Sequence, residues 1–323
     1  MSRFHALYTD YPWADAEIER GILAQADCDL VVAPDNQEAT QAALAPGMDL
    51  ILTCWAPVTA RVIDAADRCR HIARTGIGLD NIDVARATER GMLVTNVPDY
   101  CVHEVAEHTL ALIFALGRNI AGYHLATKQQ RYDLVAGLPV ERLSGKTLGL
   151  VGLGQIGKLV AAKAAALGMK VVGTNRSQRA PAGVEWLSLE ELLAASDFVS
   201  LHLPLSAESR RLVNRQTLAR MKPSAFLINT SRGGLVDHAA LGEALAADRL
   251  AGAALDVQEP EPPDLSQPPY NDPRVIVTPH VAFYSSQSTL ELRTRVAHQA
   301  AAYLRGETPE NVVNPSVLPG GRG

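Results

Sequence analysis

Residues 147–160 read Thr-Leu-Gly-Leu-Val-Gly-Leu-Gly-Gln-Ile-Gly-Lys-Leu-Val. A short apolar run comes before three glycines spaced as G-x-G-x-x-G, and an alanine-rich run follows them. This order is typical of a β-strand, a tight turn and the start of an α-helix. The stretch therefore predicts one β–turn–α unit with an unusually glycine-rich connection.

Each of the three glycines has a physical task in such a unit. Gly152 permits the tight turn, Gly154 lets the backbone approach a pyrophosphate, and Gly157 lets the helix pack closely on the strand. The helix N-terminus adds free N–H groups and a partial positive charge. A tight turn without a ligand is the ordinary alternative, but the surrounding strand and helix favour dinucleotide binding. The residues assigned to the dinucleotide are Gly152, Gly154, Gln155, Ile156 and Gly157.

The next strand candidate, residues 170–174, bears on which dinucleotide binds. An acidic residue about 20 positions after the glycines usually holds an adenosine 2′-hydroxyl, whereas a 2′-phosphate favours a cation. Here Asn175 stands in the place of the acid, and Arg176 and Ser177 follow it. A guanidinium binds phosphate bidentately and a hydroxyl adds a hydrogen bond. The sequence therefore favours NADP(H) as the cofactor, with NAD(H) as the alternative. The ordinary interpretation of Arg176 is a solvated surface arginine that binds no phosphate.

Strand and helix patterns alternate along the whole chain, which predicts parallel sheets covered by helices on both faces. At 323 residues the chain exceeds one compact core, so two domains are expected. The helix expected over residues 102–117 is apolar around most of its circumference and must be buried, between domains or between subunits. The strand candidates are residues 6–8, 30–32, 49–53, 72–74, 93–95, 148–151, 170–174, 198–203, 225–229, 252–256 and 275–278.

Composition excludes several classes of protein. The net charge of −5 does not provide the broad basic field that electrostatic nucleic-acid binding needs. No apolar run has the length of a membrane span, and the first residues lack the apolar stretch of a signal peptide. The four cysteines are widely spaced and contain no CxxC pair, so we expect reduced thiols and no metal centre. These features predict a cytoplasmic protein without nucleic-acid or membrane partners.

Three polar residues follow neighbouring strand candidates of the second half. Arg232 follows residues 225–229, Glu261 follows residues 252–256, and His280 follows residues 275–278. Because ligands bind outside the carboxyl ends of parallel strands, we expect these side chains to share one cleft. Histidine transfers protons near neutral pH, a carboxylate orients the ring, and arginine binds an anionic substrate. Taken alone, each residue has an ordinary alternative role: His280 ends a strand, Glu261 is a solvated loop charge, and Arg232 is an ion-pair partner.

The sequence resembles the D-isomer-specific 2-hydroxyacid dehydrogenase family over essentially its whole length. The segments that carry the resemblance are Arg74-Thr-Gly-Ile-Gly-Leu-Asp-Asn-Ile-Asp83, Asn96-Val-Pro98, Gly152-Leu-Gly-Gln-Ile-Gly157, Asn229-Thr-Ser-Arg-Gly-Gly-Leu-Val-Asp237, Gly252-Ala-Ala-Leu-Asp-Val257 and Thr278-Pro-His280. The resemblance implies a flavodoxin-like substrate domain (residues 1–99 and 285–323) interrupted by a Rossmann dinucleotide-binding domain (residues 100–284). It also implies a homodimer built on the cofactor domain.

The resemblance also implies roles for single residues. Arg232 would bind the substrate carboxylate and keto oxygen, His280 would be the acid/base, and Glu261 would be its partner, with Glu259 as the less favoured choice. Amides around Ile77 and Gly78 would hold the substrate carboxylate. The residues that would line the nicotinamide side are Thr230, Arg232, Asp256 and His280.

Residues 280–287 look like the C-terminal-binding-protein branch of the family, in which an aromatic residue, usually Trp, stands at the place of Phe283. We therefore assign Phe283 to the substrate side. The leading hypothesis is an NAD(P)-dependent oxidoreductase acting on a small anionic 2-keto or 2-hydroxy acid, similar to glyoxylate or hydroxypyruvate reductases. The alternatives are a dinucleotide-sensing, partner-binding protein of the co-repressor type and a phosphite dehydrogenase. Formate oxidation is disfavoured, because family formate enzymes carry an amide where Glu261 stands.

Overall fold

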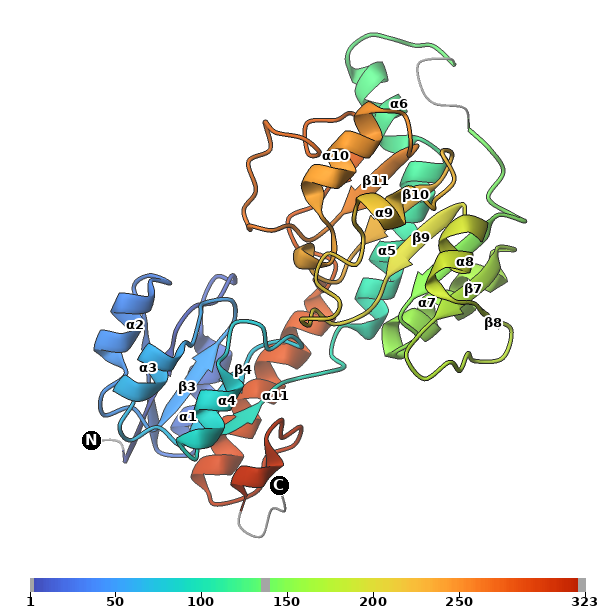
Figure 1. Cartoon of the computed structure of the whole chain (residues 1–323). Coiled ribbons are helices and arrows are strands. Elements are labelled where there is room, and N and C mark those ends of the chain that lie inside the picture. The colour runs from blue at the N-terminus through green and yellow to red at the C-terminus, as the bar shows by residue number, and fades with distance from the viewer. Residues whose placement is uncertain (1–2, 135–139, 319–323) are drawn as a thin grey trace. The chain divides into compact units, whose positions relative to one another are not determined.

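The structure is a computed structural model that describes residues 3–134 and 140–318. The chain divides into two compact units (Figure 1). Unit 1 comprises Met1–Tyr100 and Ser285–Gly323, and unit 2 comprises Cys101–Tyr284. Each unit contains one parallel sheet with helices, which confirms the predicted fold class of two doubly wound α/β domains.

Unit 1 is built on a five-stranded sheet in the order β2-β1-β3-β4-β5, the flavodoxin-like order. Its strands are β1 (Phe4–Tyr8), β2 (Cys28–Val32), β3 (Leu50–Thr53), β4 (His71–Arg74) and β5 (Leu93–Thr95). Its helices are α1 (Glu17–Ala24), α2 (Glu38–Leu44), α3 (Ala60–Ala65), α4 (Val84–Glu89) and α11 (Ser286–Leu304).

Helices cover the sheet of unit 1 because its strands are apolar on both sides. Ile51 and Ile72 form a core with Val62 of α3 on one side. On the other side α11 packs against α1 and β4, and the buried Arg293 of α11 donates two hydrogen bonds to the buried Glu19 of α1. This pairing fixes the returning C-terminal helix to the first hundred residues.

Unit 2 is built on a seven-stranded sheet in the order β12-β11-β10-β9-β6-β7-β8. Its strands are β6 (Thr147–Val151), β7 (Lys170–Thr174), β8 (Glu185–Trp186), β9 (Phe198–Leu201), β10 (Phe226–Asn229), β11 (Gly252–Leu255) and β12 (Val275–Val277). Its α-helices are α5 (Val102–Gly117), α6 (Ile120–Lys128), α7 (Gln155–Ala166), α8 (Leu189–Ala195), α9 (Arg215–Leu218) and α10 (His238–Ala246). The order reverses at β6, so β6 and β9 mark the topological switch point where dinucleotides bind.

Two separate cores flank this sheet. Leu227 of β10 contributes to a core with α8, α9 and α10, whereas the next residue, Ile228, contributes to a core with α5 and α7. The alternation explains why the strands read as continuous apolar runs. It also gives the apolar helix α5 its partners: within unit 2 it packs against α7, β10 and β11.

The sequence prediction missed several short elements. Strand β8 has only two residues and lies at the sheet edge, where few apolar positions are needed. Helices α2 and α4 have seven and six residues, too few for a periodic pattern to stand out. Helix α6 follows directly after Asn119, whose positive φ of 49° ends the preceding helix and begins a new one.

Candidate active site of the dinucleotide-binding unit

The catalytic candidates of unit 2 lie after three adjacent strands. Arg232 follows β10, Glu261 follows β11 and His280 follows β12, and these strands are neighbours in the sheet. Because the strands are parallel, their carboxyl ends meet at the same sheet edge. The topology therefore brings the three loops together, as the strand pattern predicts.

His280 and Glu261 form a direct pair. The Nδ1 atom of His280 lies 2.8 Å from Oε2 of Glu261, and the second carboxylate oxygen accepts a hydrogen bond of 2.8 Å from the backbone N–H of Gln258. Glu259, the alternative partner, instead forms an ion pair with Arg210 at 2.8 Å. The structure thus places Glu261, and not Glu259, against the histidine ring.

The environment of Glu261 favours its ionised form. Burial by itself raises the pKa of this carboxyl, but the hydrogen bond and charge of His280, the N–H of Gln258 and the charge of Arg232 together lower it below its usual range. Glu261 therefore remains a carboxylate throughout the neutral range. Arg232 donates a hydrogen bond of 2.7 Å from Nη1 to the carbonyl of Ser231.

Two glycines after Arg232 explain how its loop reaches the loop of Glu261. A Cβ atom on Gly233 would lie 2.1 Å from the carbonyl oxygen of Gln258, so only glycine permits this approach. The carbonyl of Arg232 accepts a hydrogen bond from Asn229 Nδ2 at 2.8 Å, which closes the turn after β10. The Arg-Gly-Gly sequence therefore provides the guanidinium and also lets the two loops pack closely.

Asp256 organises the segment that carries His280. Its fully buried carboxylate accepts hydrogen bonds from the hydroxyl of Thr278 (2.6 Å) and from the backbone N–H groups of Val281 and Ala282 (2.9 Å each). Its backbone carbonyl accepts the N–H of His280, whose φ is +54°. Asp256 therefore holds the backbone of His280 in a left-handed conformation that residues other than glycine seldom adopt.

Sequence reasoning missed one neighbour of this segment. His108, on helix α5, places Nε2 3.2 Å from the hydroxyl of Thr278 and 3.6 Å from Oδ1 of Asp256. Thr230 is buried and exchanges a 3.0 Å hydrogen bond with Thr109 of the same helix. Both contacts join α5 to the sheet edge, and no local sequence pattern identifies them because the partners are more than 100 positions apart.

Phe283 packs next to the acid/base candidate. Its ring centroid lies 6.3 Å from that of His280, with the ring planes 77° apart. This edge-on contact gives the histidine an apolar neighbour on one side. The role predicted for Phe283 on the substrate side stays a prediction.

The glycine turn has the geometry that a dinucleotide requires. Gly152 has a φ of +105°, and a Cβ atom there would lie 2.1 Å from the carbonyl oxygen of His202. A Cβ atom on Gly157 would lie 2.2 Å from the carbonyl oxygen of Gly152, so helix and turn are in close contact. Gly154, by contrast, has no described atom within 4 Å of its Cβ position. The open space at Gly154 and the N-terminus of α7, which no side chain caps, fit a bound pyrophosphate.

The turn after β7 holds the residues that bear on the adenosine end. Asn175 donates a hydrogen bond of 2.6 Å to the carbonyl of Arg179 and accepts one of 3.2 Å from its N–H. Its amide therefore shapes the turn that carries the exposed Arg176 and Ser177. Arg179 is a further exposed cation of this turn that the sequence interpretation did not single out.

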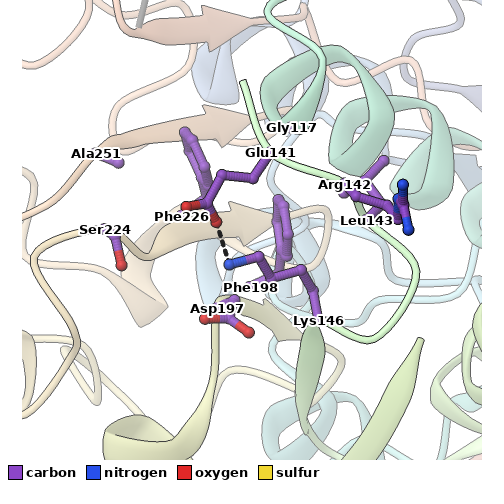
Figure 2. Close-up of a pocket in the computed structure, with 10 residues that line it drawn as sticks. All are labelled: Gly117, Glu141, Arg142, Leu143, Lys146, Asp197, Phe198, Ser224, Phe226 and Ala251. Carbon is purple, nitrogen blue, oxygen red and sulfur yellow. Dashed lines mark ion pairs between the residues drawn. The ribbon is translucent and has the colours of Figure 1, made fainter. Parts of the chain in front are cut away.

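A separate hollow of about 280 Å³ lies near the opposite edge of the sheet of unit 2 (Figure 2). It is lined by the stacked rings of Phe198 and Phe226, whose centroids are 5.2 Å apart, and by an ion pair between Lys146 and Glu141. The two phenylalanines begin β9 and β10, so this hollow lies at amino ends of strands. It is distinct from the carboxyl edge that carries Arg232 and His280.

The remaining substrate candidates belong to unit 1. Ile77 and Gly78 lie in the loop after β4, where both are partly exposed. In the described part of the chain, no group of three His, Cys, Asp or Glu side chains is placed to hold a metal ion. None of the described helices combines the length and hydropathy that crossing a bilayer requires.

Comparison with known proteins identifies the family. Residues 110–282 match the family model for the NAD binding domain of D-isomer specific 2-hydroxyacid dehydrogenases. The chain is 40% identical to D-3-phosphoglycerate dehydrogenase of Methanocaldococcus jannaschii over 275 residues, which cover 84% of this chain and 52% of that protein. It is 40% identical to glyoxylate reductase of Korarchaeum cryptofilum over 272 residues, which cover 81% of each chain.

A solved structure shows the same similarity. An acyclic imino acid reductase in complex with NADPH and D-Arg superposes with a TM-score of 0.86 at 30% identity, over 96% of this chain and all of that one. The chain spans about half the length of several of the curated relatives that it matches. Unit 2, with its glycine turn, is the part that takes a nicotinamide dinucleotide. The chain belongs to the D-isomer specific 2-hydroxyacid dehydrogenase family.

Proposed function

We propose that the protein is an NAD(P)-dependent D-2-hydroxyacid dehydrogenase that interconverts a small 2-keto acid and the corresponding 2-hydroxy acid. The observation that carries this proposal is the 2.8 Å contact of His280 with Glu261 at the carboxyl edge of a dinucleotide-binding sheet, the edge at which the loop of Arg232 also lies. When bound, the dinucleotide supplies the hydride that adds to C2 of the keto acid.

The residues of unit 2 supply the rest of the chemistry. The guanidinium of Arg232 binds the substrate carboxylate and keto oxygen and stabilises the negative charge that develops on that oxygen. His280, with Nδ1 held by Glu261, delivers a proton from Nε2 to the same oxygen. The carboxylate of Glu261 accepts a hydrogen bond from Nδ1 and fixes the orientation of the ring. In unit 1, the N–H groups of Ile77 and Gly78 are the candidates for binding a carboxylate.

We propose an unphosphorylated substrate, as for glyoxylate reductase rather than for D-3-phosphoglycerate dehydrogenase. A phosphate group favours several cations. The loop after β3 in unit 1 instead presents the exposed Trp55, and its backbone is held by the carboxylate of Asp10, which accepts the N–H groups of Cys54 and Trp55. The neighbouring Arg74 is buried and directs its guanidinium at backbone carbonyls.

An absorbance assay of reduced nicotinamide tests the proposal. NADH and NADPH are each combined with glyoxylate, hydroxypyruvate and 3-phosphohydroxypyruvate. We expect oxidation of the cofactor by glyoxylate and hydroxypyruvate, and a slower rate with the phosphorylated acid. Tight cofactor binding without turnover of any acid would favour the dinucleotide-sensing alternative, and reduction of NAD(P)⁺ by phosphite would favour phosphite oxidation.

For the cofactor we propose a preference for NADP(H). Arg176 and Arg179 are exposed in one short turn after β7, and a carboxylate is absent from the position of Asn175. Two guanidinium groups in one turn favour a 2′-phosphate over a 2′-hydroxyl.

Replacing Arg176 by alanine is expected to weaken NADPH binding about 10-fold, the size of one charge-assisted hydrogen-bonded contact, and to leave NADH binding unchanged. Fluorescence titration of both cofactors measures this. The matched control is Arg220→Ala, which removes an exposed arginine that pairs with Glu190 on the same unit. Stronger binding of NADH than of NADPH by the parent protein would overturn the preference.

Replacing Glu261 by glutamine is expected to lower kcat for reduction about 10-fold, because a neutral amide makes a weaker hydrogen bond with Nδ1 of His280 than a carboxylate does and orients the ring less firmly. Steady-state kinetics with glyoxylate measure the change. The pKa of Glu261 is lowered in the folded protein, so its contribution to stability is present above about pH 4.3 and is lost as pH falls through the lowered pKa. In thermal denaturation, Glu261→Gln should therefore be less stable than the parent at neutral pH, and the difference should vanish in acid.

Glu259→Gln is the matched control for this variant, since Glu259 lies two residues away in the same loop but pairs with Arg210. It should leave kcat within about twofold of the parent. An unchanged kcat in Glu261→Gln would show that the pair does not assist proton transfer.

We also propose a cytoplasmic homodimer. The segment that begins with α6 exposes large apolar side chains within the described residues of unit 2: Ile120 (55% exposed), Leu125 (58%), Tyr132 (95%) and Leu134 (91%). Exposed apolar side chains in one segment are typical of a protein interface. The four cysteines are buried free thiols, and burial raises the pKa of Cys54 and Cys69 to about 12, which suits a reducing compartment.

A further inference from the structure

The loop after β4 in unit 1, residues 75–78, directs all of its carbonyl oxygens into hydrogen bonds. The carbonyl of Thr75 accepts from Nη1 of Arg74, and that of Gly78 accepts from Nε of Arg74 at 2.8 Å. The carbonyl of Ile77 accepts from Nδ2 of Asn96 at 2.7 Å, and that of Gly76 accepts from a backbone N–H after β5 at 3.0 Å. Four consecutive carbonyls are thus fixed by groups of the same unit.

The N–H groups of this loop are arranged differently. Those of Thr75 and Gly76 are bonded to the carbonyls of Thr53 and Arg74. Within residues 3–134 and 140–318, no hydrogen-bond acceptor is found for the N–H groups of Ile77 and Gly78. Two successive amides without acceptors, in a loop whose carbonyls are all engaged, form the kind of concavity that binds an anion.

Arg74 adds positive charge to this loop. Its side chain is buried, with 7% of the residue exposed, and in the described part of the chain no carboxylate lies within ion-pair distance of it. A buried charge is normally paired with an opposite charge. An anion bound to the N–H groups of Ile77 and Gly78 would balance the charge of Arg74 without contacting its guanidinium, because the loop lies between them.

The sequence of the loop is adapted to this arrangement. Gly76 has a φ of +151°, and a Cβ atom there would lie 2.5 Å from Nη1 of Arg74. A side chain at position 76 would therefore displace the guanidinium from beneath the loop. Asn96 lies directly after β5, the neighbour of β4, so its amide reaches the loop from the adjacent strand.

We propose that Arg74 and Asn96 are positioning residues that hold residues 75–78 as a preformed carboxylate site, with Arg74 acting through the loop and not by touching the substrate. This inference rests on the proposed function, because it takes the bound anion to be the carboxylate of the 2-keto acid. Arg74 directly precedes residues 75–78 in the sequence. Its Nε and Nη1 groups both donate to backbone carbonyls of this loop. The site is consequently selective for a small planar anion that two adjacent amides can bind.

The test compares the variants Arg74→Lys, Arg74→Met and Asn96→Ala with the control Asn314→Ala. Asn314 is also a buried amide of unit 1 with three hydrogen bonds, to Val94, Thr88 and Met92, but it does not contact the loop. Three quantities are measured: KM and kcat for glyoxylate, the dissociation constant of NADPH, and binding of oxamate to the NADPH-loaded protein by calorimetry.

We expect KM for glyoxylate and the dissociation constant of oxamate to rise about 30-fold in Arg74→Met and about 10-fold in Asn96→Ala, with a smaller change in kcat. Arg74→Lys keeps the charge but loses the two-armed contact, so its effect should lie between that of the parent and that of Arg74→Met. NADPH affinity should stay constant in every variant. Asn314→Ala should lower the melting temperature and leave both substrate constants within about twofold.

Two outcomes would overturn the inference. One is a KM and an oxamate affinity that stay within about twofold of the parent in Arg74→Met. The other is an equal rise in Asn314→Ala, which would show a general effect of destabilising unit 1. Failure of the proposed function looks different: the parent would bind oxamate, and Arg74→Met would weaken it, without turnover of any keto acid.

Discussion

Replacement of His280 by alanine is expected to lower kcat for keto-acid reduction about 10³-fold, within the range that general acid–base catalysis contributes. The physical reason is that hydride addition to C2 places negative charge on the keto oxygen, and His280 is the group held in place to protonate it. Its ring is fixed by a 2.8 Å contact with Glu261 and by a backbone segment that Asp256 anchors. Steady-state kinetics with glyoxylate and NADPH measure the effect.

The same substitution should leave the cofactor affinity within about twofold, because the glycine turn and the turn after β7 are untouched. His298→Ala, an exposed histidine on α11 of unit 1, is the matched control and should behave like the parent. Near-normal turnover in His280→Ala would refute the acid/base assignment. It would also redirect attention to His108, the second histidine linked to the same segment.

Replacement of Arg232 by lysine is expected to lower kcat/KM about 10³-fold although the charge is kept. A guanidinium contacts a carboxylate and an adjacent oxygen at the same time in a fixed planar geometry, whereas an ammonium makes single contacts. The loop of Arg232 is held rigidly by Asn229 and by the close approach of Gly233 to Gln258. The substitution therefore changes the functional group without releasing the backbone.

Kinetics over a range of glyoxylate concentrations separate the two parts of this loss. Both KM and kcat should change, since Arg232 binds the ground state and stabilises the charge that develops in the transition state. The control is Arg215→Lys, which alters an exposed arginine paired with Glu243 on the same unit. Equal losses in both variants, or a loss confined to NADPH binding, would contradict the proposed role of Arg232.

The parts of the fold and site that follow from local sequence were predictable. The spacing of the glycines predicts the turn after β6, because a Cβ atom at Gly152 or Gly157 would collide with the backbone and only glycine fits there. Arg232, Glu261 and His280 were predictable as a group for a topological reason: each follows a strand, and parallel strands end at a common edge. Neither inference needs knowledge of side-chain contacts.

What the sequence did not reveal depends on contacts between distant residues. His108 reaches Thr278 across 170 positions, and Asn96 reaches Ile77 from a neighbouring strand. Arg74 donates to the carbonyls of Thr75 and Gly78, and the sequence alone did not reveal these contacts. Asn175 is similar, since its amide closes a turn with Arg179 and is not simply a replacement for an acid. Hydrogen-bond partners of this kind are set by tertiary packing and leave no periodic signal.

The configuration of the product tests the proposed D-2-hydroxyacid dehydrogenase activity. Purified protein is incubated with hydroxypyruvate and NADPH, and the glycerate formed is separated by chiral chromatography. We expect D-glycerate alone, in an amount equal to the NADPH consumed. Formation of L-glycerate, or bound NADPH with no glycerate at all, would contradict the proposed activity.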